Sequence, residues 1–438
     1  MHAAPTEKRF WYYVLPSMLT MVLSGFYVIV DGFFIGQATG DIGLGAINLA
    51  WPITAVMQAT GIGVGIGGSV LFSMYQGAHE NQEARKARGN TILLLFLLSV
   101  FMMIFFWFTS DSILVLFGAR GALFDAARDY IHVVIFGTLF QIFGCGLTPL
   151  IKNSGRAISA MLIMISGLVT NVILDALFIM VFPWGLAGAA AATATAQGVV
   201  AILSLLLIIF DKKLPFSFSD LRLQTEKMIR ILKIGVSPFG VSLAPSIVII
   251  FANWQCLAYG QETAVAAYSV LSYVSATFLA LLQGIGDGVQ PIISYLHGAG
   301  EKKNVEHVRF RAVRLAVVLG CLFFLFSIPT TSFFSGLFGV SDAAAKMAKS
   351  GLILTAVAYP FAGLVRCSIS YFYATGDTKL STCFTYLDPL LFTPVFLFVL
   401  PVFFDVEGIW SVLAAVQITM SVLILTVFYS RRKKSKKF

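Results

Sequence analysis

The sequence predicts an all-α integral membrane protein in which twelve transmembrane helices form two six-helix lobes. Hydrophobic residues make up 58% of the 438 residues, and the mean hydropathy is +0.87. A soluble protein of this size could not bury so much apolar surface. Long apolar runs alternate with short polar gaps, and landmarks of the first half recur about 220 residues later. We therefore expect a parallel pseudo-two-fold repeat with a central cavity between the lobes.

Each apolar run is long enough to cross the hydrocarbon core of a bilayer, which requires about 20 residues of helix. Turn residues separate the runs, as in Pro183-Trp184-Gly185. The expected spans of the first lobe are residues 10–35, 46–75, 91–109, 129–150, 157–182 and 186–210. The expected spans of the second lobe are residues 232–254, 264–295, 312–333, 348–374, 381–404 and 408–429.

The basic residues set the expected orientation. If the N-terminus is cytoplasmic, the inside segments hold 25 Lys and Arg residues, the outside loops hold four, and Arg366 lies within a span. Positive charge accumulates on the cytoplasmic side of membrane proteins, so we expect both termini in the cytoplasm. The net charge of +9 is explained by this topology and by attraction to anionic lipid, and not by binding to nucleic acid.

The internal repeat sets the expected domain limits. Matching residues lie 220 to 223 positions apart in the sequence. The matches are Pro16 with Pro238, Tyr75 with Tyr295, Glu80 with Glu301, Arg88 with Arg309 and Gly185 with Gly408. We expect an N-lobe at residues 1–212, a cytoplasmic linker at 213–227, and a C-lobe with a basic tail at 228–438. Because each lobe has an even number of spans, both lobes enter the membrane from the same side.

Polar residues inside three N-lobe spans form the main candidate site. Asn171 and Asp175 are four residues apart, which places both side chains on one face of a helix. Asp31 and Thr193 lie on two other spans at a similar depth, roughly 7–12 Å inside the outer boundary. A carboxylate in hydrocarbon costs about 2.5–3.5 kcal/mol, so it usually faces a cavity or a partner. We expect this cluster to bind a proton or Na⁺; the alternative is a static buried polar network.

The second half has a different polar group. The positions that match the N-lobe cluster hold Asn253, Pro394, Phe398 and Val416. Instead, Asp287 lies in the eighth span, Arg366 in the tenth and Asp388 in the eleventh. We expect Asp287, together with Gln283, to contact a cationic substrate. The alternative is that Arg366 forms a structural ion pair with Asp287 or Asp388, because an unpaired charge there would be costly.

These features together resemble the multidrug and toxic compound extrusion (MATE) family, especially its DinF-like and MepA-like bacterial branches. The resemblance rests on the two six-helix lobes, on Pro16 fifteen residues before Asp31, on the Asn171/Asp175 pair, and on Thr193 in the next helix. It implies export of cationic, amphipathic compounds in exchange for H⁺ or Na⁺ across the plasma (inner) membrane of a bacterium. It also implies that Asp31, Asn171, Asp175 and Thr193 form the cation-coupling site, and that Pro16 is a hinge in the first helix.

The chain departs from one branch of this family. The NorM-like branch places carboxylates in the seventh and tenth helices, whereas this chain has Asn253 and Gln255 in the seventh helix and no acid in the tenth. This difference argues against a Na⁺ site in the C-lobe. We expect Asn253 and Gln255 to contribute to substrate binding together with Gln283 and Asp287.

Other sequence patterns argue against an enzyme or a cofactor protein. The segment Gly61–Gly68 formally contains Gly-x-Gly-x-x-Gly, but it lies within a span and no strand precedes it, so close helix packing is the better interpretation. There is no Walker motif, and the Cys and His residues show no metal-ligand spacing. We expect no metal, no organic cofactor and no nucleic-acid partner. We expect a monomer in the lipid bilayer that prefers H⁺ over Na⁺ as its coupling ion.

Three alternative functions fit the sequence less well. A lipid-linked oligosaccharide flippase of the same superfamily would need several cationic residues to hold pyrophosphate, and only Arg366 is a candidate. An integral membrane enzyme would need a catalytic cluster at the membrane face, and the sequence has none. A passive channel is disfavoured by the two-lobe repeat and the lack of a filter-like segment. The leading expectation is a secondary active multidrug exporter that works by alternating access.

Overall fold

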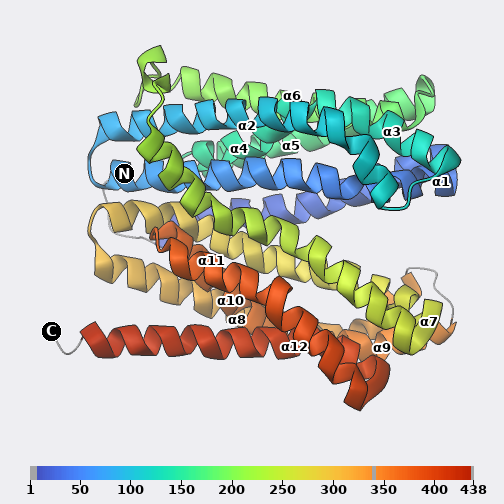
Figure 1. Ribbon diagram of the computed structural model, residues 1–438. Coiled ribbons are helices and arrows are strands. Elements are labelled where there is room, and N and C mark those ends of the chain that lie inside the picture. Colours follow the sequence, from blue (N-terminus) through green and yellow to red (C-terminus); the bar gives the residue numbers. More distant parts are fainter. Residues whose placement is uncertain (1–6, 338–341, 436–438) are drawn as a thin grey trace. The chain divides into compact units, whose positions relative to one another are not determined.

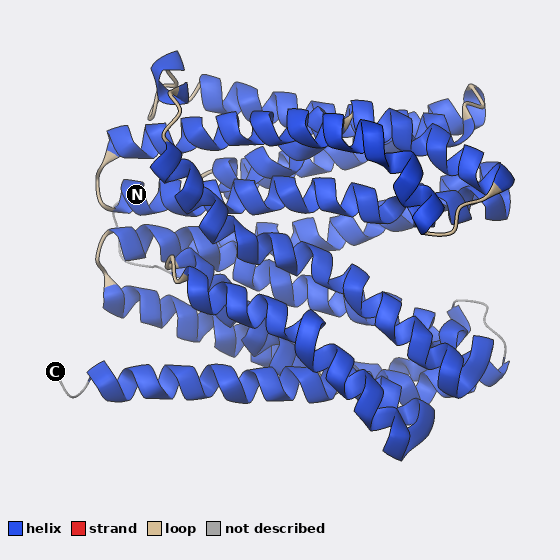
Figure 2. Cartoon of the chain, in the orientation of Figure 1, coloured by secondary structure: helices blue, strands red, loops and turns tan. Residues whose placement is uncertain are grey.

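The computed structural model describes residues 7–337 and 342–435, and every regular element among them is a helix (Figures 1 and 2). The first half contains α1 (Glu7–Gly77), α2 (Asn81–Leu116), α3 (Gly121–Phe136), α4 (Thr138–Asn153), α5 (Ala157–Asp175), the π-helix η1 (Ala176–Val181) and α6 (Gly185–Ile209). The second half contains the short 3₁₀ helix η2 (Phe218–Leu221), α7 (Thr225–Gly298), α8 (Lys302–Leu337), α9 (Asp342–Ala356), α10 (Tyr359–Ala374), α11 (Thr378–Leu387), the π-helix η3 (Asp388–Phe392) and α12 (Thr393–Ser435).

Three of these helices are interrupted at a single residue. The backbone leaves the helical region at Gly40 in α1, at Gln261 in α7 and at Asp405 in α12, each with a positive φ. An unbroken α7 would be about 110 Å long, against a hydrocarbon core of about 30 Å. Each interruption therefore separates two membrane crossings that follow one another without an extended loop.

The number of crossings agrees with the hydropathy pattern. Eight helical segments of the described chain are long and apolar enough to span a membrane, and two bent pairs, α3 with α4 (57°) and α9 with α10 (49°), each add one. Two of the eight, Thr225–Gly298 and Thr378–Lys433, contain the interruptions at Gln261 and Asp405 and supply two crossings each. The described residues thus carry the twelve predicted spans.

The chain forms two compact units. Unit 1 contains the chain up to Leu243 together with Ser294–Lys302, and unit 2 contains Ala244–Ile293 and the chain from Lys303 onward. This division assigns the beginning of α7 to unit 1. The lobe limits expected from the repeat, with a linker at 213–227, describe a different division and stay a prediction.

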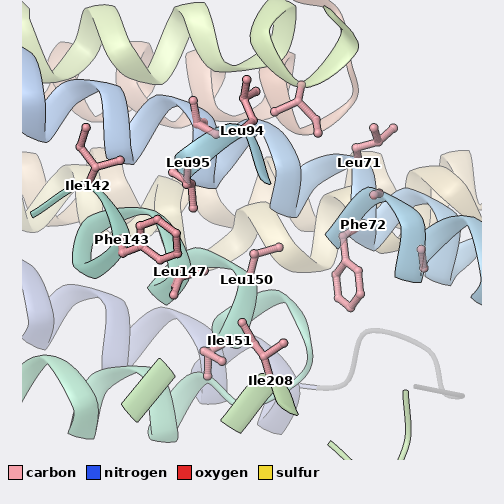
Figure 3. Close-up of a cluster of buried hydrophobic side chains, with 14 of the residues drawn as sticks. Leu71, Phe72, Leu94, Leu95, Ile142, Phe143, Leu147, Leu150, Ile151 and Ile208 are labelled. Atoms are coloured by element: carbon pink, nitrogen blue, oxygen red, sulfur yellow. The ribbon is translucent and has the colours of Figure 1, made fainter. Parts of the chain in front are cut away.

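Apolar side chains hold unit 1 together. Helix α1 packs against α2, α4 and α5, and α6 packs against α4 and α5. Leu95 of α2 and Ile142, Leu147 and Ile151 of α4 belong to a buried cluster that Ile208 of α6 completes (Figure 3). Between membrane helices, such packing stabilises through close van der Waals contact. The cluster therefore fixes the framework on which the polar residues of unit 1 are carried.

The glycine-rich segment of α1 confirms the packing interpretation. A Cβ atom added to Gly65 would lie 2.6 Å from the Cα of Gly146 in α4, so the two backbones touch. Gly61 similarly faces the backbone of Ile142. Small residues at such positions allow membrane helices to approach closely.

The linker before α7 is bound to α2. Asn90 of α2 donates from Nδ2 to the Arg222 carbonyl oxygen at 3.1 Å and accepts from the Gln224 N–H at 2.8 Å. Arg85 donates from Nε to both carboxylate oxygens of Asp220 and from Nη2 to Oδ1, and Asp220 also caps η2. These contacts give the linker a defined path along unit 1.

In unit 2, α12 packs against α9 and α10, and α10 packs against α11. The buried Trp410 of α12 stacks on Tyr268 of α7 with ring centroids 6.2 Å apart. Arg309 of α8 lies over the Phe428 ring of α12 at 4.0 Å from its centroid. The polar residues of α7, α10 and η3 lie within this framework.

Candidate functional site

Three helices of unit 1 bring the four predicted cation-site residues together. Asp31 comes from the first part of α1, Asn171 and Asp175 from α5, and Thr193 from α6. Nδ2 of Asn171 donates to Oγ1 of Thr193 at 3.4 Å. The carboxyl groups of Asp31 and Asp175 lie close enough for each to influence the charge of the other. The convergence of these helices at one polar cluster is therefore a feature of the structure, while the role of each residue stays a prediction.

The cluster contains buried oxygen atoms that lack donors. Asn171 and Asp175 are 0% exposed. Both carboxyl oxygens of Asp175, Oδ1 of Asp31 and Oδ1 of Asn171 have no hydrogen-bond partner among the described residues. Buried polar atoms are normally satisfied, and a buried carboxylate without a counter-charge is especially costly. These unsatisfied oxygen atoms therefore form a suitable site for a small positive species. It can be a proton on a carboxyl oxygen or an alkali cation that several of the oxygens coordinate.

A bound proton would explain how two carboxyl groups can lie close together inside unit 1. Two carboxyl groups can form a hydrogen bond with each other only when one of them carries a proton. If both carboxyl groups were ionised, they would repel each other. Asp31 and Asp175 are thus arranged so that they can share one proton.

The local backbone at Asp175 is unusual. Helix α5 ends at Asp175 and continues as the π-helix η1. Single π-helical turns within α-helices occur frequently at functional sites. The hydrophobic pattern around Asp175 gives no sign of this wider turn, so sequence reasoning did not find it.

Tyr130 is a second feature that the sequence did not reveal. This residue of α3 is buried and lies close enough to Asp31 and Asp175 to experience the charge of both. Its hydroxyl group adds a neutral polar group to the cluster. The chain has 14 tyrosines, and nothing in the local sequence distinguishes this one.

Unit 2 contains the second predicted polar group. Gln283 and Asp287 lie in the second part of α7, Arg366 in α10 and Asp388 at the start of η3. Nη1 of Arg366 donates to Oε1 of Gln283 at 3.1 Å, and Nε2 of Gln283 donates to Oδ1 of Asp287 at 2.9 Å. Asp388 accepts hydrogen bonds from Thr393 and Gln417 at 2.9 and 2.7 Å. Arg366 and Asp388 attract one another electrostatically, while their direct hydrogen bonds are with neutral side chains.

The remaining predicted residues lie outside these two clusters. Asn253 is half-buried and Gln255 is buried, both in the first part of α7 before the interruption at Gln261. Pro16 is buried within α1, and its carbonyl oxygen accepts from Oγ1 of Thr20 at 2.8 Å. The helix continues through Pro16, so the hinge stays a prediction about motion.

A bundle of twelve apolar spans with a carboxyl pair buried inside one unit defines a polytopic membrane transporter as the class of protein. The MatE family model matches residues 16–177 and, a second time, residues 234–399. The chain belongs to this family, the multidrug and toxic compound extrusion transporters. The two matches also place the internal repeat on the two halves of the chain.

Curated relatives match over nearly their whole length. The chain is 26% identical over 433 residues to the multidrug export protein MepA of Staphylococcus saprophyticus, covering 97% of this chain and 94% of the relative. It is 25% identical over 441 residues to MepA of Staphylococcus aureus strain MRSA252, covering 98% and 95%.

Solved structures have the same fold. An outward-facing multidrug resistance MATE family transporter of the MOP superfamily superposes with a TM-score of 0.94 and 21% identity, covering 100% of this chain and 98% of that one. A MATE crystal structure in the bent conformation gives a TM-score of 0.91 and 21% identity, covering 98% and 96%. The predicted all-α, two-lobe membrane fold is confirmed by these similarities.

Proposed function

We propose that this protein is a secondary active multidrug exporter that exchanges cationic, amphipathic compounds for a cation, with H⁺ preferred over Na⁺. Family membership and the names of the MepA relatives support multidrug export. The choice of coupling site rests on one observation: Asp31, Asn171 and Asp175 have buried oxygen atoms that accept no hydrogen bond from the described residues. The proximity of the two carboxyl groups supports the proton as the coupling ion.

The proposed cycle follows from the chemistry of this cluster. A proton entering from outside binds between Asp31 and Asp175 and removes their mutual repulsion, which stabilises one arrangement of the helices that carry them. Release of the proton to the cytoplasm restores the repulsion and favours the other arrangement. When one proton exchanges for a drug with one positive charge, no net charge crosses the membrane, so the pH difference across the membrane supplies the free energy for export.

The cellular setting completes the proposal. The bacterial relatives and the basic residues of the inside segments support the plasma membrane of a bacterium, with both termini cytoplasmic. The protein acts as a monomer surrounded by lipid. Its substrates are small cations with apolar surfaces, which can partition into the membrane before they bind.

Ethidium efflux from lipid vesicles tests the proposal. The purified protein is reconstituted, and efflux is measured first under an imposed pH gradient and then under an imposed Na⁺ gradient. We expect efflux with the pH gradient alone. Efflux that requires Na⁺ would reassign the ion, and no efflux with either gradient would contradict multidrug antiport.

Variants of the carboxyl pair test the site. Asp31→Asn and Asp175→Asn should each abolish gradient-driven efflux while the protein still inserts and elutes as a single species. Asp125→Asn is the matched control because Asp125 is an exposed carboxylate on α3, and it should retain efflux. Efflux near the wild-type rate in both cluster variants would remove the carboxyl pair from the coupling site.

A further inference from the structure

One exposed face of α8 changes from basic to apolar along the helix. Four exposed residues, spaced three or four positions apart, lie on this face in its first turns: Lys303, His307, Phe310 and Arg314. The same face continues with four exposed apolar residues: Val318, Cys321, Leu325 and Ile328. We call the first four residues the Arg314 face. Its basic part ends, and the apolar part begins, just after Arg314.

The opposite side of α8 is packed inside unit 2. Val308 and Ala312 are buried on that side. A Cβ atom on Gly363 of α10 would lie 2.7 Å from the carbonyl oxygen of Ala316, so the backbones of α8 and α10 approach closely. Helix α8 is therefore fixed on one side, and the Arg314 face points away from this packing.

The basic residues of the Arg314 face have no acidic partner in the described chain. Neither Arg314 nor Lys303 forms an ion pair or a side-chain hydrogen bond with a residue that the structure describes. Glu306, on the neighbouring side of the helix, is bound by Arg309 and by the hydroxyl group of Tyr371 at 3.0 Å. The positive charge of this face is therefore free to attract an anion from outside the described protein.

The internal repeat shows that the matching face of α2 is covered by protein. Phe310 matches Gly89 of α2, 221 residues earlier. A Cβ atom on Gly89 would lie 2.0 Å from the carbonyl oxygen of Asp220, so the linker passes directly over that position. Phe310 is instead 65% exposed. Helix α8 thus presents a large apolar ring at the position where α2 has a glycine beneath the linker.

The length of α8 places Arg314 near the lipid head groups. From Arg314 to its last residue, Leu337, α8 rises roughly 35 Å, whereas the hydrocarbon core of a bilayer is about 30 Å thick. Long side chains on a helix lean toward its N-terminus, and arginine extends its charged group to the membrane surface. The guanidinium of Arg314 can therefore reach the level of Phe310, where phosphate groups of the bilayer lie.

We propose that the Arg314 face of α8 binds an anionic phospholipid. The planar guanidinium of Arg314 donates hydrogen bonds to the phosphate group, and Lys303 adds a second positive charge. The acyl chains lie along the apolar part of the face that begins at Val318. A soluble phosphate ion would use only the charged part of this surface, whereas a phospholipid uses both parts. The site is independent of the compound that the protein exports.

Quenching of a tryptophan on this face by brominated phospholipids tests the site. Phe310→Trp is reconstituted into phosphatidylcholine vesicles that contain an equal minor fraction of either brominated phosphatidylglycerol or brominated phosphatidylcholine. The signal of the wild-type tryptophans is subtracted. We expect the anionic lipid to be preferred at this position by about tenfold, because each basic residue near the membrane surface attracts anionic lipid. Ile328→Trp is the control reporter, since Ile328 lies on the apolar part of the same helix face, and it should show no preference.

Removal of the two basic groups should remove the preference. In the Phe310→Trp protein, the further substitutions Lys303→Gln and Arg314→Gln should together reduce the preference to less than about twofold. Lys212→Gln with Lys213→Gln is the matched control, because it removes the same charge from two exposed lysines of the linker. This control should keep the preference of the Phe310→Trp protein.

Three results would overturn the site. Equal quenching of Phe310→Trp by the two lipids would mean that anionic lipid is not preferred there. An equal loss of preference in both double variants would assign the effect to the net charge of the protein. Inorganic phosphate at matched ionic strength should leave the preference unchanged, and competition by phosphate would indicate a site for soluble anions instead. Ethidium efflux is measured separately, so its failure would contradict the proposed function and leave the lipid site standing.

Discussion

The amide of Asn171 donates a 3.4 Å hydrogen bond to the hydroxyl oxygen of Thr193, and so joins α5 to α6 beside the carboxyl pair. This contact matters for the choice of coupling ion. An alkali cation needs several oxygen ligands, and Thr193 would be one of them. A proton needs only one of the carboxyl oxygens. Removal of the Thr193 hydroxyl group should therefore impair coupling to an alkali cation but not coupling to a proton.

Thr193→Val replaces the hydroxyl group with a methyl group of similar size. If the protein couples to H⁺, ethidium efflux under a pH gradient should stay within about threefold of the wild type, because a proton on a carboxyl oxygen does not need the Thr193 hydroxyl group as a ligand. The measurement is the initial efflux rate in vesicles at matched protein content. Thr195→Val is the control, since Thr195 lies on the same helix and is exposed. A loss of more than about tenfold in Thr193→Val alone would indicate a ligated cation instead.

Gly65→Ala tests the contact between α1 and α4. The added methyl group would meet the backbone of Gly146, which cannot move aside as a flexible side chain can. We expect a loss of about 1–3 kcal/mol in stability from this overpacking. A lower midpoint temperature of thermal unfolding in detergent would report it. Gly25→Ala is the matched control because nothing lies within 4 Å of its added Cβ, and equal midpoints in the two variants would contradict the packing argument.

The hydropathy pattern predicted the spans well, because every membrane crossing requires a long apolar run whatever its neighbours are. It did not predict that consecutive spans join at a single residue such as Gly40 or Gln261. A turn of this kind needs only one residue outside the helical region, so it leaves the apolar pattern on both sides unchanged. The predicted gaps were therefore in the right places, but their local structure was not predictable.

The polar clusters were predictable in part. Asp31 and Asp175 are identifiable because an acid within an apolar run is rare. Tyr130 and the Gln283 bridge to Arg366 are not, because their roles depend on helices that are far apart in the sequence. The π-helix after Asp175 also escaped prediction, since its side chains are as apolar as those of an ordinary turn.

Asn90→Ala tests how the linker is attached to α2. The substitution removes the hydrogen bonds to the Arg222 carbonyl oxygen and the Gln224 N–H. We expect a loss of about 1–3 kcal/mol in stability, the net value of two hydrogen bonds. The linker should also become more susceptible to limited proteolysis, which is detected by mass spectrometry of the fragments. Gln82→Ala, at an exposed position of α2, should change neither property, and an unchanged cleavage rate in Asn90→Ala would contradict the attachment.

Glu83 provides a test of pH dependence outside the membrane spans. Its carboxylate accepts hydrogen bonds from Lys227 of α7 and, at 2.7 Å, from Lys86 of α2. These two ammonium groups, Lys227 first, lower the pKa of Glu83 below its ordinary value of 4.5. A carboxyl group with a lowered pKa in the folded state stabilises the protein at pH values above the unfolded pKa. That contribution is lost as the pH falls through the lowered, folded value.

Glu83→Gln should therefore lower the unfolding temperature at pH 7 by about 1–2 °C, because the ion pairs are partly exposed and only moderately strong. The difference from the wild type should be constant between pH 6 and 8. It should shrink as the pH falls below about 4.5, where Glu83 of the unfolded chain begins to be protonated, and should vanish below the lowered pKa of the folded state. Glu80→Gln, at an exposed carboxylate before α2, should match the wild type at every pH. A difference between Glu83→Gln and the wild type that grows toward low pH would have the wrong sign, and would mean that Lys227 and Lys86 do not stabilise the ionised form of Glu83.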